Sequence, residues 1–170
     1  MANPCSFCDA TCCKNYLITV TSFDVARIAR RTGKKPDEFA CFYPAKILNY
    51  DWDTVLQFYD TGPLPDYCLL TLKSWPCVFL EKNKCSIHKL SPLICKRYPF
   101  DLAGNLIARH CGVASKALFI IRGPGENDRL REIDSYKAIV KDWNEIKGKK
   151  EDCMEFILKR SADFKEHAAP

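Results

Sequence analysis

The chain of 170 residues lacks several features that would place it in a familiar class. It has no run of about 18 or more apolar residues, so no transmembrane helix is predicted. Residues 1–5 show no basic segment leading into an apolar one and do not resemble a secretory signal peptide. We therefore expect the chain to remain in the reducing cytoplasm, where clustered cysteines are metal ligands or catalytic thiols rather than disulfides.

Signatures of nucleotide, nucleic-acid and radical chemistry are also missing. Neither G-x-G-x-x-G nor a P-loop sequence occurs, so no nucleotide fold or conventional methyltransferase domain is predicted. Lys and Arg are scattered rather than arranged in a stripe with aromatics, which argues against nucleic-acid binding. Cys8 and Cys12 begin a radical-SAM spacing, but Asn15 stands in its third place. No catalytic residue is assigned, and whether the chain is an enzyme stays open.

Cysteine is what the chain does contain in quantity. Its 11 cysteines are an odd number, which fits badly with a closed disulfide framework. Thiolates are soft ligands that suit zinc, copper(I) or iron–sulfur clusters. Eight of the cysteines form two series, a compact C-x2-C-x3-C-C and a spaced one: Cys5, Cys8, Cys12 and Cys13, then Cys77, Cys85, Cys95 and Cys111. We predict that folding brings both series together around metal, with one or two [4Fe–4S] clusters preferred and zinc as the alternative.

The spacing within the first series suggests how the ligands divide. A C-x2-C turn such as Cys5–Cys8 directs two thiolates toward one metal. Cys12 and Cys13 are adjacent, so their side chains are expected to point apart. Either one is a ligand and the other is core, or, as we prefer, they serve two neighbouring centres. Two four-thiolate centres of about −2 each would reduce the formal net charge of +5 to about +1.

The other candidate ligands have plainer interpretations. His88 and His110 follow or precede cysteines of the second series and could supply nitrogen, but both are interpreted as ordinary polar residues. Cys41, Cys68 and Cys153 stand alone in apolar surroundings, where a free cysteine behaves as a small hydrophobe. We assign these three to the core.

The remaining pattern predicts a small single α+β domain. Strands are expected at 16–20, 54–59 and 68–72, and hairpins at 77–87 and 101–108. Helices are expected at 22–33, with Ser22 as N-cap, and at 35–39 and 93–98. A pair of helices follows: the first begins near residue 126, and the second spans about 150–166. Residues 1–125 would form a cysteine-cluster metal-binding region, with 126–166 as C-terminal helices packed on the same domain.

A composite motif supports the metal interpretation. After the C-x2-C-x3-C-C come Cys77-Val78-Phe79-Leu80, Cys85-Ser86-Ile87, Ser91-Pro92 and Cys95-Lys96-Arg97-Tyr98-Pro99-Phe100. In this order they resemble the YkgJ-like cysteine-cluster proteins, which are described as zinc- or iron-chelating. The resemblance covers residues 5 to about 111 and implies that the eight cysteines are the ligands. The flagellin lysine methylases look like relatives carrying the same cluster, which implies a protein-modification role for some members.

These features favour an iron–sulfur protein that serves as a redox, electron-transfer or assembly component of a larger system. Such a role implies a protein partner. The alternatives are a structural zinc protein that acts as an interaction module, and a protein-modification enzyme related to the flagellin lysine methylases.

Overall fold

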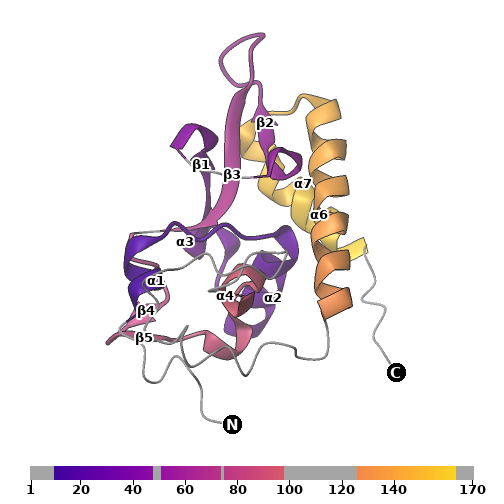
Figure 1. Ribbon diagram of the computed structural model, residues 1–170. Coiled ribbons are helices and arrows are strands. Elements are labelled where there is room, and N and C mark those ends of the chain that lie inside the picture. The colour runs from indigo at the N-terminus through magenta and orange to yellow at the C-terminus, as the bar shows by residue number, and fades with distance from the viewer. Residues whose placement is uncertain (1–9, 48–50, 74, 98–125, 164–170) are drawn as a thin grey trace.

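A three-stranded antiparallel sheet occupies the upper half of the computed structural model in Figure 1. The structure describes residues 10–47, 51–73, 75–97 and 126–163. The strands of this sheet are β1 (Ala40–Pro44), β2 (Leu56–Phe58) and β3 (Asp66–Leu72), in the order β1-β3-β2. A two-stranded hairpin, β4 (Leu80–Glu81) with β5 (Lys84–Cys85), forms a second sheet. Helices accompany both sheets, so the predicted α+β class is confirmed.

The central strand β3 is buried on both faces from Cys68 to Leu72. One face joins the main hydrophobic cluster, which includes Leu70, Leu72 and Phe58. The other face carries Leu69 against Ala45 and Val55. Burial on both sides explains why this strand reads as a continuous apolar run rather than as an alternating one.

The outer edge of β2 is covered by α6 (Glu126–Ile146) rather than by another strand. The backbone N–H of Gln57 donates to Asn144 Oδ1 at 2.9 Å, and Asn144 Nδ2 donates to the Val55 carbonyl at 2.9 Å. Trp143 Nε1 donates to the Gln57 carbonyl, also at 2.9 Å. The side chains of one helix thus satisfy the edge that a fourth strand would otherwise occupy.

The C-terminal helical pair is confirmed as α6 and α7 (Lys150–Asp163). The apolar side chains of α6 are buried from Tyr136 through Trp143, whereas Leu130 near its start is exposed. The helices turn at Lys147 and Gly148, where a side chain at position 148 would collide with the Trp143 indole. Glycine is therefore required for the two helices to meet.

Helix α2 (Ser22–Thr32) packs against α7 and α6, and Ser161 Oγ donates to Ser22 Oγ at 2.6 Å. Its N-cap is Thr21, not Ser22 as predicted, because Thr21 and Asp24 form a reciprocal capping box. Gly33 ends the helix with a φ of 72°, as expected of a left-handed C-cap.

Three sequence expectations need correction. The predicted strand at 16–20 is reduced to an isolated bridge between Thr19 and Thr71, although Val20 and Ile18 still hydrogen-bond to β3. The expected strand at 54–59 begins later, since η3 (Trp52–Thr54) is a 3-10 turn and β2 follows it. Strand β1 was not expected, because only the short helix before it, α3 (Pro36–Phe39), had a clear signal in Pro36 and the acidic residues behind it.

The connection from β1 includes a second 3-10 turn, η2 (Ala45–Ile47). The predicted hairpin at 101–108 lies outside the described residues, as do Phe164 and the end of the last helix. The division at residue 125 stays a prediction. Within the described ranges, no helix is both long and apolar enough to cross a membrane.

Candidate metal centre

Helix α1 (Thr11–Asn15) holds Cys12 and Cys13 side by side. Their sulfurs are 3.9 Å apart. The expectation that the two side chains point well apart is therefore wrong. Successive residues of a helix are about 100° apart around its axis, whereas those of a strand face opposite sides. A helical backbone thus leaves both thiols able to reach the same neighbourhood.

The loop before the β4–β5 hairpin is joined directly to α1. The backbone N–H of Cys77 donates to the Cys13 carbonyl at 2.8 Å. Cys77 and Phe79 are buried in the main hydrophobic cluster, where the rings of Phe79 and Phe39 lie 5.5 Å apart. The loop thereby fixes a member of the second cysteine series beside the first.

The hairpin at 77–87 is confirmed, but its strands are only two residues each, and Cys77 precedes them. Lys82 and Asn83 form the connection with φ values of 47° and 61°. Positive φ at both central residues is the geometry of the tight turns that suit two-residue hairpins. This turn pairs Leu80 with Cys85, which packs against the main cluster.

Helix α4 (Leu93–Arg97) carries Cys95 and confirms the short helix expected after Ser91-Pro92. It follows the 3-10 turn η4 (His88–Leu90). Leu93 is buried, and its backbone N–H donates to Asp24 Oδ1 at 3.1 Å. A carboxylate from α2 therefore fixes the start of the helix that presents Cys95.

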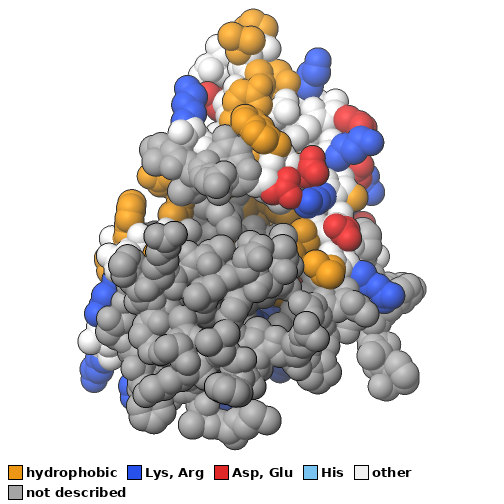
Figure 2. Space-filling model, viewed as in Figure 1, with side chains coloured by type: hydrophobic (Ala, Val, Ile, Leu, Met, Phe, Trp, Pro, Cys, Tyr) orange, Lys and Arg blue, Asp and Glu red, His pale blue; other side chains and the backbone are white. Residues whose placement is uncertain are grey.

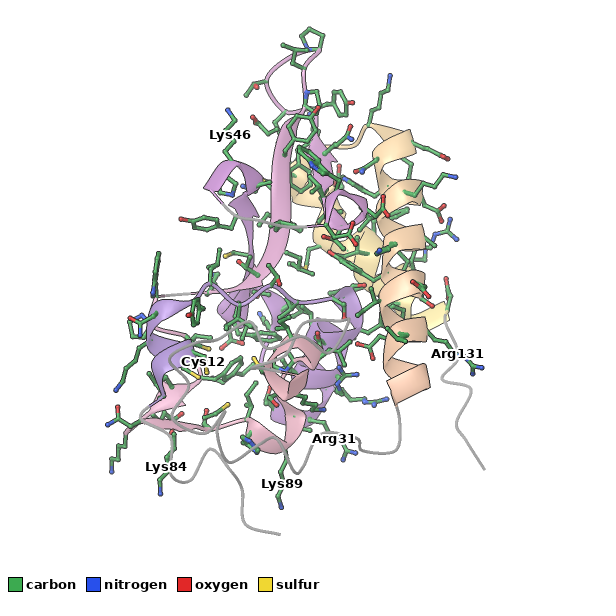
Figure 3. All side chains as sticks on the ribbon, in the orientation of Figure 1. Cys12, Arg31, Lys46, Lys84, Lys89 and Arg131 are labelled. Atoms are coloured by element: carbon green, nitrogen blue, oxygen red, sulfur yellow. The ribbon has the colours of Figure 1, made fainter. Side chains whose placement is uncertain are left out.

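The thiols of Cys12, Cys77 and Cys85 lie near enough to that of Cys95 to raise its pKa. Burial is the largest cause that raises the pKa of Cys95, followed by these three thiols and then by Asp24. The pKa of Cys77 is raised mainly by burial, with a backbone hydrogen bond from Phe79 opposing. Figure 3 shows sulfur atoms near the labelled Cys12, between α1 and α4. Four segments thus bring their thiols to one end of the molecule.

The environment of these thiols differs from that of a catalytic cysteine. The pKa of Cys12 is raised well above the ordinary thiol value, first by its hydrogen bond with Cys13 and then by burial. Catalytic and redox-sensing cysteines instead have pKa values lowered by cations, histidines or helix N-termini. Thiols whose pKa values are raised by burial lack this activation.

The described part of the site is incomplete as a metal centre. Across the four described ranges, no three His, Cys, Asp or Glu side chains are arranged so that they could hold an ion. The eight described cysteines are all free thiols. Cys5, Cys8 and Cys111 lie outside the described residues. The eight-cysteine ligand set therefore stays a prediction.

An ionic network behind the thiols was missed by sequence reasoning. Asp24 is fully buried, pairs with Arg27 and accepts the backbone N–H of Thr21. Arg27 also reaches Glu132 of α6 at 3.0 Å, and Thr21 Oγ1 donates to the same carboxylate at 3.1 Å. Burial raises the pKa of Asp24, while Arg27 opposes the shift. The Thr21-x-x-Asp24 capping spacing was visible in the sequence, but its link to the helix carrying Cys95 was not.

The remaining cysteines and histidines mostly fit their plainer interpretations. Cys68 and Cys153 are buried, which confirms them as core residues. Cys41 is only half-buried, and its sulfur lies 3.5 Å from Thr71 Oγ1. His88 lies partly buried on η4, and His110 falls outside the described residues. The pKa of Cys153 is raised by burial, which is consistent with a neutral core thiol.

A depression of about 810 Å³ lies elsewhere, between α6, η3 and β2. Its lining includes Trp52, Tyr59, Lys137 and Asn144 but no cysteine. Lys137 is already paired with Asp51 at 2.6 Å. This hollow is separate from the thiols.

Comparison with known families agrees with the position of the thiols. Residues 4–112 match the CxxCxxCC family, described as a "putative zinc- or iron-chelating domain". This confirms the resemblance to the YkgJ-like proteins and supports metal binding, with zinc or iron as the metal. The matched span contains all eight cysteines of the two series. No curated protein and no solved structure matches the chain.

Proposed function

This chain belongs to the CxxCxxCC family, and from that premise we propose that it is an iron–sulfur protein. It would act as a redox, electron-transfer or assembly component of a larger system. The observation that carries the proposal is the convergence of Cys12, Cys77 and Cys85 on the thiol of Cys95. These residues come from α1, from the loop before β4, from β5 and from α4, so the fold itself gathers them.

The donors on this chain fit the group. Iron–sulfur clusters are held by cysteine thiolates, and the described donors are all thiols. Four of them, Cys13, Cys77, Cys85 and Cys95, belong to the main hydrophobic cluster or pack against it. The proposed ligands are Cys5, Cys8, Cys12, Cys13, Cys77, Cys85, Cys95 and Cys111. When bound, a cluster would supply one-electron redox chemistry, with a potential set by burial, charge and hydrogen bonds to sulfur.

The surrounding residues have defined parts in this proposal. The Phe79 backbone hydrogen bond to Cys77 would stabilise the thiolate form, since it lowers the pKa of that thiol. Asp24 orients α4 through the Leu93 N–H and so positions Cys95. Phe79 and Ile87 belong to the buried cluster that excludes water from this side of the thiols. We also infer a cytoplasmic location, because a reducing compartment keeps the thiols available to metal.

A structural zinc site is the second candidate, and one distance favours it. Sulfurs that share a tetrahedral zinc at about 2.3 Å would be separated by about 3.8 Å. The sulfurs of Cys12 and Cys13 are 3.9 Å apart. In that case the metal would cross-link the short elements, and the surface would recruit a partner.

Elemental analysis of the full chain purified without oxygen separates the two candidates. Iron and acid-labile sulfide in near-equal amounts, with a visible absorption that bleaches on reduction, would support the iron–sulfur proposal. Colourless protein with zinc and no sulfide would reject it in favour of the structural site. Protein that holds neither metal would reject both.

Matched cysteine variants test the ligand set. Cys95→Ser and Cys8→Ser should lower metal content and the melting temperature. Cys153→Ser is the control: its thiol is buried in the core and outside the two series, so metal content should not change. Unchanged metal in both Cys95→Ser and Cys8→Ser would contradict the assignment.

A further inference from the structure

Positive charge is concentrated in the segment that carries the second cysteine series. Residues 73–97 contain six Lys or Arg and a single acidic residue, Glu81, which gives this segment a net charge of +5. The preceding residues 48–72 contain four acidic residues and no Lys or Arg. Cations that seemed scattered along the whole chain are therefore unevenly distributed around Cys77, Cys85 and Cys95.

The structure places three of these lysines on the surface beside the thiols. Lys82 is in the hairpin turn, Lys84 is on β5 and Lys89 is on η4, and all three are exposed. None of them forms an ion pair with a residue that the structure describes, whereas Arg27, Lys137 and Arg160 all pair with carboxylates. In Figure 3, Lys84 and Lys89 lie at the same end as Cys12, and Lys46 lies at the opposite end.

The hairpin geometry explains this arrangement. Neighbouring residues of a strand face opposite sides, so Lys84 points outward when Cys85 packs against the core. Figure 2 shows the consequence: charged side chains visible along the lower left margin, where β4 and β5 lie in Figure 1, are Lys or Arg. Over α6, by contrast, both signs are interspersed.

Apolar side chains are exposed in the same segment. Trp75 is 64% exposed, and Val78 and Ile94 are 38% and 36% exposed. Val78 follows Cys77, and Ile94 precedes Cys95. Protein interfaces combine aromatic and apolar side chains with a charged rim that guides the approach of the partner.

We propose that the lysine face, defined as Lys82, Lys84 and Lys89 with Val78 and Ile94, docks a protein partner with an acidic surface. The inference rests on the proposed function, because a partner docked at this face would lie beside the proposed metal centre. An acidic protein complements the positive charge of these lysines, and its apolar contacts would cover Val78 and Ile94. Nucleic acid would use the lysines but leave these aliphatic side chains exposed. Such an interface steers association and weakens with salt.

The experiment uses the full chain, purified without oxygen, and a small acidic ferredoxin as the probe. Binding is measured by calorimetry at about 50 mM and about 300 mM salt. The charge-reversal variant K82E/K84E/K89E should weaken binding at low salt by about tenfold or more. The control K46E/K149E/K159E makes the same change in net charge at exposed lysines elsewhere and should weaken binding by about twofold or less. Equal losses in the two variants, or none in either, would overturn the proposal.

Two further measurements separate this proposal from the function it rests on. The neutral variant K82Q/K84Q/K89Q should lose part of the binding while its metal content matches that of the unmodified chain. Lost binding with retained metal would support the lysine face, and a chain that holds no metal would reject the proposed function instead. A basic cytochrome c should not bind. Tighter, lysine-dependent binding of a single-stranded oligonucleotide than of the ferredoxin would overturn the choice of a protein partner.

Discussion

Two regions of this molecule are stabilised in different ways. The sheet region (β1, β2, β3, α6 and α7) contains a seven-residue strand, a 21-residue helix and a 14-residue helix. The cysteine region (α1, β4, β5, η4 and α4) consists of elements with two to five residues each. Helices and hairpins this short are not stable on their own in water. The sheet region therefore contains the long elements of the fold, whereas the short elements of the cysteine region depend on their contacts with the rest of the molecule.

The buried polar groups show the same difference. In the sheet region, Asn144 and Trp143 satisfy the edge of β2 with side-chain hydrogen bonds. In the cysteine region, the thiol of Cys77 is buried and those of Cys85 and Cys95 are partly buried, and thiols are weak hydrogen-bonding partners. Their strongest available interaction is with a metal. If the proposed metal binds there, the order that depends on packing and the order that depends on metal lie in separate regions of this fold.

Removal of metal should produce the largest difference between the two regions. After treatment with a chelator under reducing conditions, backbone amides of α1, β4, β5 and α4 should exchange with solvent within minutes. Amides of β3 and α6 should stay protected, because the strand pairing of β3 with β1 and β2 and the hydrogen bonds between β2 and α6 use none of the proposed ligands. Hydrogen exchange followed by mass spectrometry measures both sets in one sample. A uniform loss of protection across both regions would contradict the division.

Trp143→Ala should destabilise the sheet region by about 3–5 kcal/mol. The indole is 2% exposed, packs edge-on against Phe58 and donates to the Gln57 carbonyl. The free energy of unfolding is measured by urea titration on the metal-free chain. Ile146→Ala, at an exposed position of the same helix, is the control and should change it by less than about 0.5 kcal/mol.

The Asp24 side chain connects the two regions, and Asp24→Ala should lower the free energy of unfolding by about 3 kcal/mol. It leaves the partly buried Arg27 without one partner and the Leu93 N–H without its acceptor. Because α4 carries Cys95, metal content should fall as well, which a purely local destabilisation would not cause. Asp37→Ala, at an exposed position in the first turn of α3, should leave both quantities unchanged. Full metal content in Asp24→Ala would mean that α4 does not depend on this carboxylate.

Asn144→Ala should cost about 2 kcal/mol, since it leaves the Gln57 N–H and the Val55 carbonyl without partners. The change is confined to the sheet region, so metal content should stay the same. Unfolding followed by circular dichroism, with Glu145→Ala as the exposed neighbour for control, checks the difference. An equal, small effect in both variants would show that the edge of β2 does not need this amide.

Tyr136→Phe should raise the free energy of unfolding by about 1 kcal/mol, the smallest of these effects. The Tyr136 hydroxyl is buried and has no hydrogen-bond partner among the described residues. Tyr59→Phe is the matched control, for which the change in the free energy of unfolding should have the opposite sign. Its hydroxyl donates to Gln57 Oε1 at 3.2 Å, so removing it should lower stability slightly. A loss of stability in Tyr136→Phe would mean that this hydroxyl is satisfied in solution.

In both regions the sequence predicts some elements and misses others, for a physical reason. The stripe from Tyr136 to Trp143 and the apolar run of β3 are periodic signals that local burial produces. Helix α1 has five residues and no apolar period, so nothing in its sequence distinguishes it from a loop. Strand β1 ends at Pro44 and owes its form to pairing with β3, which a local pattern does not reveal.

The candidate site was predictable in its residue types but not in its geometry. The spacing of Cys77, Cys85 and Cys95 indicated a shared neighbourhood, and the structure brings Cys77 and Cys85 close to Cys95. The predicted orientation of the Cys12 and Cys13 side chains was wrong, because the actual orientation depends on the backbone being helical. The part played by Asp24 could not be foreseen, since its contact with Leu93 joins residues far apart in the chain.

The covered edge of β2 has a consequence for how the chain is made. The residues of β2 are synthesised early. Their hydrogen-bonding groups are covered by residues that are synthesised roughly 90 positions later, namely Trp143, Asn144 and Gly148. At about 5–20 residues per second, that interval lasts roughly 5–20 seconds. During this time the nascent sheet presents an open edge to other chains. Truncation before α6 should therefore give an aggregating fragment, and a ribosome-associated chaperone would be most useful in that interval.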